Sequence, residues 1–145
     1  MQDFTTTKPP SWYWLVAALA LVWNLFGVMA YIAQVTMPAA ISEAMTAAER
    51  AAVAAQPAWY VGAFAIAVFG GTLGCLLLLL RRRWAVWALA LSLAAIIVQQ
   101  LYYWVLTDVG AGMAGWELGI SLLIPVVAAL LLWIAVRADR HGWLK

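Results

Sequence analysis

The stretch FGGTLGCLLLLLRRRWAVW, residues 69–87, decides the fold of this 145-residue chain. Three glycines lead into five consecutive leucines, which are followed by three arginines and a tryptophan. An apolar run that ends abruptly in positive charges is typical of a helix that crosses a bilayer and reaches the headgroup region. The pattern therefore predicts that residues 81–83 form a short turn between two antiparallel membrane-spanning helices.

The composition of the whole chain agrees with that interpretation. Hydrophobic residues make up 68% of the chain and charged residues 10%, and the mean hydropathy is +0.95. Soluble domains average about 25% charged and about 45–50% apolar residues. The apolar excess is too large for one small core, so we expect an integral membrane protein. With one cysteine and one histidine, the chain offers no internal disulfide or cysteine cluster, and we expect no metal or cofactor.

Four apolar stretches reach the length of about 20 residues that crosses the hydrocarbon layer, and aromatic residues bracket each of them. We place these spans near residues 12–35, 58–80, 84–106 and 116–136. The first span exceeds the apolar core of a signal peptide, about 7–15 residues, so we expect it to be retained. The fold class that follows is all-α, a four-helix membrane bundle that forms one domain over residues 1–145.

The segments outside the spans are short. The loop 36–57 contains Thr46-x-x-Glu49, a capping-box pattern, and it ends at Gln56-Pro57. These signals predict one or two short helices at the membrane surface. The tail, residues 137–145, is basic and contains one tryptophan, which indicates an anchor at the membrane interface.

The distribution of charge predicts the orientation of the bundle. With four spans, both termini lie on the same side as residues 81–83, and that side holds seven basic and two acidic residues. The other side holds Arg50 with four acidic residues: Glu43, Glu49, Asp108 and Glu117. Because cytoplasmic segments carry the positive excess, we expect cytoplasmic termini, a periplasmic loop and a location in the inner membrane.

Small residues form a stripe on the second span. At 100° per residue, one narrow face holds Ala63, Ala67, Gly70 and Gly74, with Gly71 beside it. Small residues let two helices approach closely in a bilayer. The stripe is either a contact with another helix of the same chain or a seam with a second copy or a partner membrane protein.

Polar side chains gather on one face of the other three spans, mostly in their periplasmic halves. Such faces turn inward because lipid offers no hydrogen-bond partners. One interpretation is a wet vestibule that binds a small molecule; the other is a set of amides that bond to one another and hold the bundle together. Pro125 should kink the fourth span beside this face. The candidate ligand-binding residues are Asn24, Tyr31, Gln34, Gln99, Gln100, Tyr103, Glu117 and Ser121.

Arg81, Arg82 and Arg83 have two interpretations as well. They set the topology of the chain, and they could also bind the anionic headgroups of membrane lipids. Catalysis is disfavoured, because no span carries a histidine, a nucleophile paired with a base, or two close carboxylates. A nucleic-acid partner is excluded by the membrane location. Two function classes remain: a small-molecule binder or transporter, and an accessory protein that packs against partner helices through its glycine and tryptophan faces.

Several segments resemble a family of small, uncharacterised four-span bacterial inner-membrane proteins that are sometimes labelled sugar transporters. The segments are Trp23-Asn24-Leu25-x-Gly27, Gln56-Pro57-Ala58-Trp59, Phe69-Gly70-Gly71-x-x-Gly74, Arg81-Arg82-Arg83-Trp84-Ala85 and Gly142-Trp143-Leu144. The resemblance implies the fold and the inner-membrane location.

Two other families are similar only in part. Small multidrug resistance proteins share the four spans but carry a carboxylate in the first one, where this chain has Asn24. Translocator (tryptophan-rich sensory) proteins have a helix entry like Lys8-Pro9-Pro10-Ser11-Trp12, but they have five spans.

Overall fold

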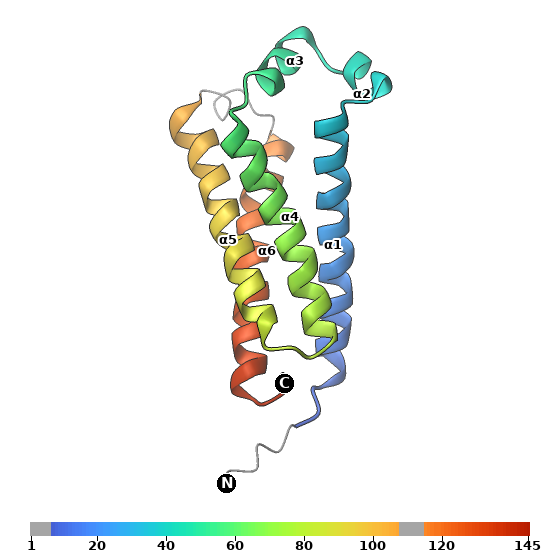
Figure 1. The fold of residues 1–145 in the computed structure, drawn as a ribbon, viewed down its shortest axis with the longest axis vertical. Coiled ribbons are helices and arrows are strands. Elements are labelled where there is room, and N and C mark those ends of the chain that lie inside the picture. The colour runs from blue at the N-terminus through green and yellow to red at the C-terminus, as the bar shows by residue number, and fades with distance from the viewer. Residues whose placement is uncertain (1–6, 108–114) are drawn as a thin grey trace.

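The computed structural model describes residues 7–107 and 115–145, and these form a bundle of four long helices that are apolar enough to cross a membrane (Figure 1). The prediction of an all-α four-helix membrane bundle is confirmed. Asp3 and Asp108, which entered the charge argument, lie outside the described residues. The long helices are α1 (Ser11–Thr36), α4 (Ala58–Leu79), α5 (Trp84–Leu101, continued by the π-helix η1, Tyr102–Leu106) and α6 (Gly115–Arg140), and the short ones are α2 (Ala39–Ala44) and α3 (Ala47–Ala54).

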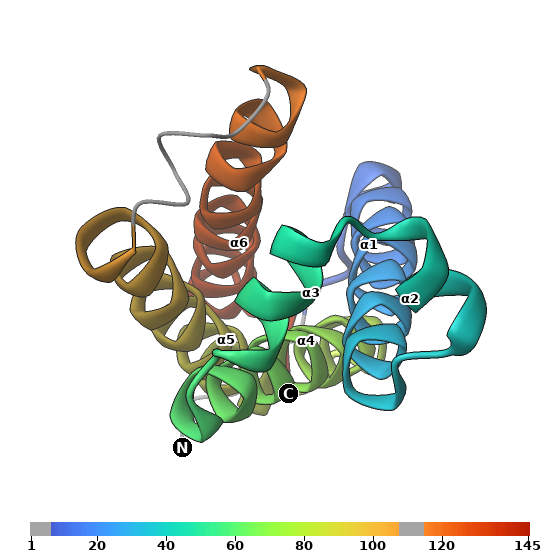
Figure 2. The same ribbon diagram turned by 90° about the horizontal axis from the view of Figure 1, so that it is seen from above.

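The start of α1, the turn between α4 and α5, and the end of α6 lie at one end of the bundle, which we call the terminal end (Figure 1). Helices α2 and α3 lie at the opposite end, the loop end. Helix α1 packs on α4, α4 on α5 and α5 on α6, whereas α1 and α6 share few contacts. Seen from the loop end, the four helices form an arc with α1 and α6 at its two extremities (Figure 2).

Two helix ends differ from the predicted spans. Helix α6 continues to Arg140, four residues beyond the predicted end at Val136. It stops at Gly142, whose φ of 69° is accessible to glycine without strain, and the Trp143 amide donates to the Ala138 carbonyl at 2.9 Å. The third span was predicted as a regular helix, but its last five residues form the π-helix η1. A π-helical turn widens the backbone and often occurs beside functional sites.

The loop between α1 and α4 contains the capping box that its sequence predicts. The Glu49 amide donates to Thr46 Oγ1 at 3.2 Å, and the Thr46 amide donates to Glu49 Oε2 at 2.6 Å. Hydrogen bonds from Thr46, first of all from its backbone amide, stabilise the charged carboxylate and lower the pKa of Glu49. Arg50 Nη1 donates to the carbonyls of Ser42 at 2.5 Å and Met45 at 2.8 Å, so the only basic residue of this loop holds the end of α2.

The terminal half of the bundle contains the tightest packing. Gly74 of α4 lies against Leu89 of α5: a Cβ at Gly74 would be 2.5 Å from the Leu89 Cγ and 3.4 Å from its backbone nitrogen. Close approach of α4 and α5 therefore requires glycine there. The Tyr13 hydroxyl of α1 donates to the Leu78 carbonyl of α4 at 2.7 Å, and this bond joins α1 to the same core. The buried residues of this core are Tyr13, Ala17, Ala20, Cys75, Leu78, Ala85, Leu89, Leu131, Ala135, Ala138 and Leu144.

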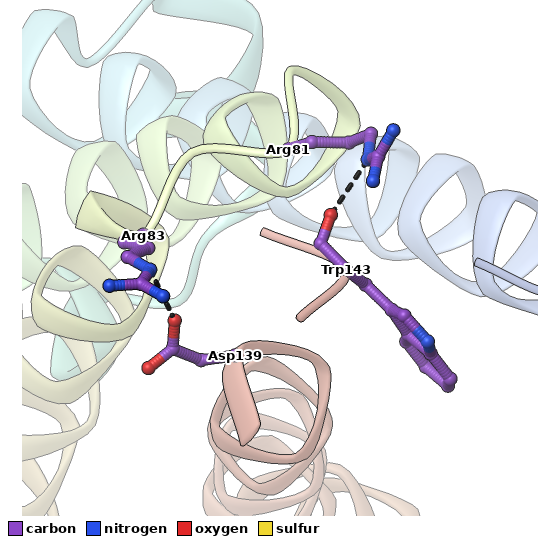
Figure 3. A network of polar contacts seen from close by, with 4 residues as sticks. All are labelled: Arg81, Arg83, Asp139 and Trp143. Carbon is purple, nitrogen blue, oxygen red and sulfur yellow. Dashed lines mark hydrogen bonds and ion pairs between the residues drawn. The ribbon is translucent and has the colours of Figure 1, made fainter. Parts of the chain in front are cut away.

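The C-terminal residues fold back onto the turn between α4 and α5, an arrangement we call the tail clasp (Arg81, Arg83, Trp143, Leu144 and Lys145). The Lys145 amide donates to the Arg81 carbonyl at 2.6 Å, and the Arg83 amide donates to the Lys145 carbonyl at 3.0 Å. Arg81 Nε donates to the Trp143 carbonyl at 2.7 Å (Figure 3). Leu144 is 1% exposed. The last residues of the tail are therefore packed into the core at the terminal end.

The three arginines of the turn have different surroundings. Arg81, with a positive φ of 56°, also donates from Nη2 to the Thr7 carbonyl at 2.9 Å. Arg83 pairs with Asp139 of α6 at 3.0 Å (Figure 3). Arg82 and Arg83 are exposed, whereas Arg81 is half-buried. Arg82 and Arg83 are therefore exposed enough to contact lipid headgroups as predicted. The guanidinium of Arg81 instead donates to carbonyls of the chain itself.

Candidate ligand site

Two adjoining cavities lie between the four long helices, and all four contribute to the first. The first, which we call the apolar cavity, has a volume of about 290 Å³. The second, the polar cavity, has a volume of about 320 Å³ and lies toward the loop end. Both are lined by Phe64, Ile96, Gln99 and Ile124, so they adjoin along a shared wall.

The polar cavity gathers six of the eight predicted ligand residues. They come from α1, α5, η1 and α6, so the fold brings together side chains that are far apart in the sequence. Those six residues are Gln34, Gln99, Gln100, Tyr103, Glu117 and Ser121, and the cavity is completed by Tyr60, Phe64, Ile96, Trp116, Ile120 and Ile124.

Gln100 and Ser121 join α5 to α6 at the wall of the polar cavity. Proline has no N–H, so Pro125 leaves the carbonyl of Ser121, four residues earlier, without its helical donor. Gln100 Nε2 donates to that carbonyl, and Ser121 Oγ donates back to Gln100 Oε1 at 3.3 Å. The side chain of one helix therefore satisfies a backbone group that a proline has freed on the next.

Asn24 of α1 lies in the apolar cavity rather than the polar one. Its Nδ2 donates to the Ala20 carbonyl at 2.8 Å and to Cys75 Sγ at 3.5 Å. Its Oδ1 lies where a side chain at Gly71 would be, so Gly71 makes room for the amide. Asn24 thus bonds to α4 and to its own helix rather than to the glutamines of α5, contrary to the interpretation in which the amides bond to one another.

Two more polar groups of the apolar cavity are accounted for within the protein. Ser92 Oγ of α5 donates to the Ala67 carbonyl of α4 at 2.6 Å. Gln99, which lines both cavities, interacts with the phenol of Tyr60. The remaining lining is apolar and consists of Trp23, Phe26, Gly27, Ala30, Phe64, Ala67, Val68, Gly71, Leu89, Ile96, Ile124, Val127, Ala128 and Leu131. An occupant of this cavity meets mainly hydrocarbon and aromatic surface.

Tyr31 is the predicted ligand residue that the structure places elsewhere. Its ring packs edge-on against Phe64 at 5.5 Å and Phe69 at 5.7 Å between ring centroids, and it lines neither cavity. Tyr31 shares a helical face with Asn24, but near the loop end that face meets the aromatic side chains of α4. Tyr31 is therefore a packing residue between α1 and α4.

The stripe of small residues on α4 lies inside the bundle. A Cβ at Gly70 would contact Ser92 at 3.4 Å, and Gly71 lies between Asn24 and Ser92. Ala63 and Ala67 are buried. The stripe thus faces α1 and α5 of the same chain.

Tyr60 is a site residue that the sequence analysis missed. It is 4% exposed, and its ring lies 4.7 Å from that of Tyr102 and 5.6 Å from that of Tyr103. It was counted among the aromatic residues that mark the membrane surface. The signal that could have found it is its spacing: Tyr60 stands three residues before Ala63, on the same inward face of α4.

The loop end of the bundle is covered by α3 (Figures 1 and 2). Gln34 Nε2, at the loop end of α1, donates to Gln56 Oε1, just after α3, at 2.7 Å. Because Gln34 also lines the polar cavity, this bond links the wall of the cavity to the segment that lies above it.

Glu117 is the only charged side chain among the described residues that line either cavity. It stands in the first turn of α6, where the helix dipole stabilises a negative charge. Within residues 7–107 and 115–145, no three histidine, cysteine, aspartate or glutamate side chains are grouped so that they could hold a metal ion.

No protein-family profile, curated protein or solved structure matches this chain.

Proposed function

We propose that this membrane protein binds a small molecule in the adjoining cavities, either to hold it or as the first step of transport. The main observation that supports this proposal is that the site has two chemically different parts. Amides, hydroxyls and one carboxylate line the cavity at the loop end, and an apolar cavity lies deeper in the bundle. Ligand sites of this kind combine a mainly apolar wall with a few polar groups that fix orientation. The excess of basic residues at the terminal end supports an orientation in which the polar cavity faces the periplasm.

The core beneath the cavities supports binding from the loop end. The buried cluster around Cys75 and Leu78 fills the terminal half, and the tail clasp covers its end.

The alternative is an accessory protein that packs against partner helices through its glycine and tryptophan faces. Trp84 and Trp87 are exposed on α5 and remain available for such contacts. Gly71 and Gly74, however, are already in contact with α1 and α5 of the same chain. The glycine part of that surface is therefore occupied, which favours the binding proposal.

A pair of neighbouring alanines on α6 tests the proposal. Ala128 lines the apolar cavity, whereas Ala129 is exposed on the outer surface. The purified wild-type protein and the variants A128F and A129F are extracted with organic solvent, and the bound small molecules are quantified by mass spectrometry. We expect a molecule that is retained by the wild type and A129F and lost from A128F. Equal content in both variants would contradict the proposal.

A further inference from the structure

The shape and chemistry of the two cavities define the class of molecule they fit, given the proposed binding function. The two cavities share the lining residues Phe64, Ile96, Gln99 and Ile124 and therefore lie side by side, and we treat them as two compartments of one site. The polar cavity would hold a head that forms hydrogen bonds, and the apolar cavity would hold a hydrocarbon chain. That combination describes a single-chain amphiphile.

The charge of the lining restricts the head further. Glu117 contributes a negative charge, and no lysine, arginine or histidine lines either cavity in the described part of the chain. A negatively charged head placed there would meet a like charge without a compensating cation, which is strongly unfavourable in a partly desolvated site. Uncharged and cationic heads meet no such penalty, since the amides and hydroxyls can bond to either.

The apolar cavity also reaches the outer surface of the bundle between α1 and α6. Phe26 of α1 and Ile124 of α6 both line it, and their exposed fractions are 64% and 37%. Helices α1 and α6 share few contacts, so the mouth of the cavity is not closed by helix packing. At this depth, the surface of a spanning helix faces hydrocarbon, so an acyl chain can enter from the bilayer itself.

We infer that the site takes a single-chain amphiphile whose head carries no negative charge, with the head beside Glu117 and the chain beside Ala128. This inference deepens the proposed function and depends on it. It makes Glu117 a specificity-determining residue, because its carboxylate excludes anionic heads.

The test compares three molecules that share a decyl chain: decyl glucoside, decyltrimethylammonium and decyl sulfate. The protein is placed in nanodiscs of zwitterionic lipid, and the saturable binding of tritium-labelled decyl glucoside is measured below the micellar concentration. The two charged compounds are then used as competitors. In the wild type, we expect decyltrimethylammonium to compete and decyl sulfate to be weaker by about tenfold or more.

Two isosteric variants test whether Glu117 causes the preference for decyltrimethylammonium over decyl sulfate. E117Q removes the carboxylate of the cavity, and E43Q removes an exposed carboxylate on α2 that lines neither cavity. We expect E117Q to bring the affinity for decyl sulfate to within about threefold of that for decyltrimethylammonium, and E43Q to leave the wild-type ratio unchanged.

The outcomes separate the two proposals. If all three compounds bind equally well to the wild type and A128F abolishes their saturable binding, the cavities bind amphiphiles but the inference about the head is wrong. If no decyl compound binds saturably, the inferred ligand class is wrong, whereas equal small-molecule content in extracts of A128F and A129F would overturn the proposed function itself. Discrimination that persists in E117Q would overturn the role of Glu117.

Discussion

The two halves of this bundle are built from the same four helices but are packed differently. In the terminal half, Gly74 contacts Leu89, the Tyr13 hydroxyl bonds to the Leu78 carbonyl, and the tail covers the end. Toward the loop end, the polar cavity lies between the helices, and the apolar cavity beside it extends down to Leu89 and Leu131 at the edge of the buried core of the terminal half. We therefore call the terminal half the closed half and the loop half the hollow half.

The difference follows from the size of the side chains at the interfaces. Apolar burial does not drive helices together in lipid, so close approach depends on small residues. The terminal half supplies them on several helices, among them Ala17, Ala85 and Ala135, each nearly or fully buried. The loop half places the rings of Tyr60 and Tyr103 between the helices, and rings cannot interdigitate as closely. The hollow half is therefore available for a ligand.

The variant G74L should have the largest effect, because it would force α4 and α5 apart in the closed half. The added side chain would overlap the Leu89 side chain and lie close to the Leu89 backbone nitrogen, and Leu89 is itself buried. We expect a loss of about 3 kcal/mol in the free energy of unfolding, typical of an overpacked core. The loss is measured by unfolding in mixed micelles with increasing denaturing detergent.

The matched control is G62L on the same helix, where a Cβ would meet nothing within 4 Å. G62L should leave the stability within about 0.5 kcal/mol of the wild type. Equal destabilisation by the two variants would show that the closed half is not packed through Gly74.

The tail clasp gives the next largest effect. L144A removes a side chain that is 1% exposed in the core of the terminal end, and we expect it to cost about 2 kcal/mol in the same unfolding measurement. L80A, at an exposed leucine beside the same turn, should be nearly neutral. If L144A were as neutral as L80A, the tail would be an interfacial anchor as its sequence indicates.

The sequence predicts the four helices well because each depends only on local composition. Apolar runs of sufficient length, aromatic residues at their ends and the capping box at Thr46 all act within a few residues of chain. The position of the tail could not be predicted in this way. Its position depends on Arg81, more than 60 residues away in sequence, whose guanidinium donates to the Trp143 carbonyl and whose carbonyl accepts from the Lys145 amide.

The candidate site could be predicted only in part, for a similar reason. Helical periodicity shows which residues share a face, and it placed Gln99, Gln100 and Ser121 on inward faces. It does not show which neighbour a face meets, so Tyr31 was assigned to the site although α4 covers it. It also could not show that α1 and α6 stay apart, which depends on the packing of all four helices.

The bond between Gln100 and the Ser121 carbonyl tests the hollow half, where a polar contact joins α5 to α6 beside the cavity. We expect Q100L to cost about 1 kcal/mol, the usual scale for hydrogen bonds between spans. In the P125A background, the restored backbone N–H satisfies Ser121, so Q100L should cost less there. The measurement is a double-mutant cycle on unfolding free energies. Equal costs in both backgrounds would refute the link to Pro125.

The smallest effect concerns the loop that covers the hollow half. Because the bonds to Thr46 lower the pKa of Glu49, the folded capping box binds fewer protons than the unfolded segment, whose glutamate has a pKa of about 4.3. The contribution of the capping box to the stability of α3 is therefore complete above about pH 4.3, the unfolded pKa, and it is lost as the pH falls through the lower pKa of the folded state. NMR chemical shifts of α3 should report this loss below about pH 4, while those of α4 stay constant.

In E49Q the amide keeps the capping bond without titrating, so the shifts of α3 should no longer depend on pH in this range. An unchanged pH profile in E49Q would show that another group controls α3. A simultaneous change in α4 would show that the loop and the bundle unfold together, and the closed and hollow halves would then be less independent than their packing indicates.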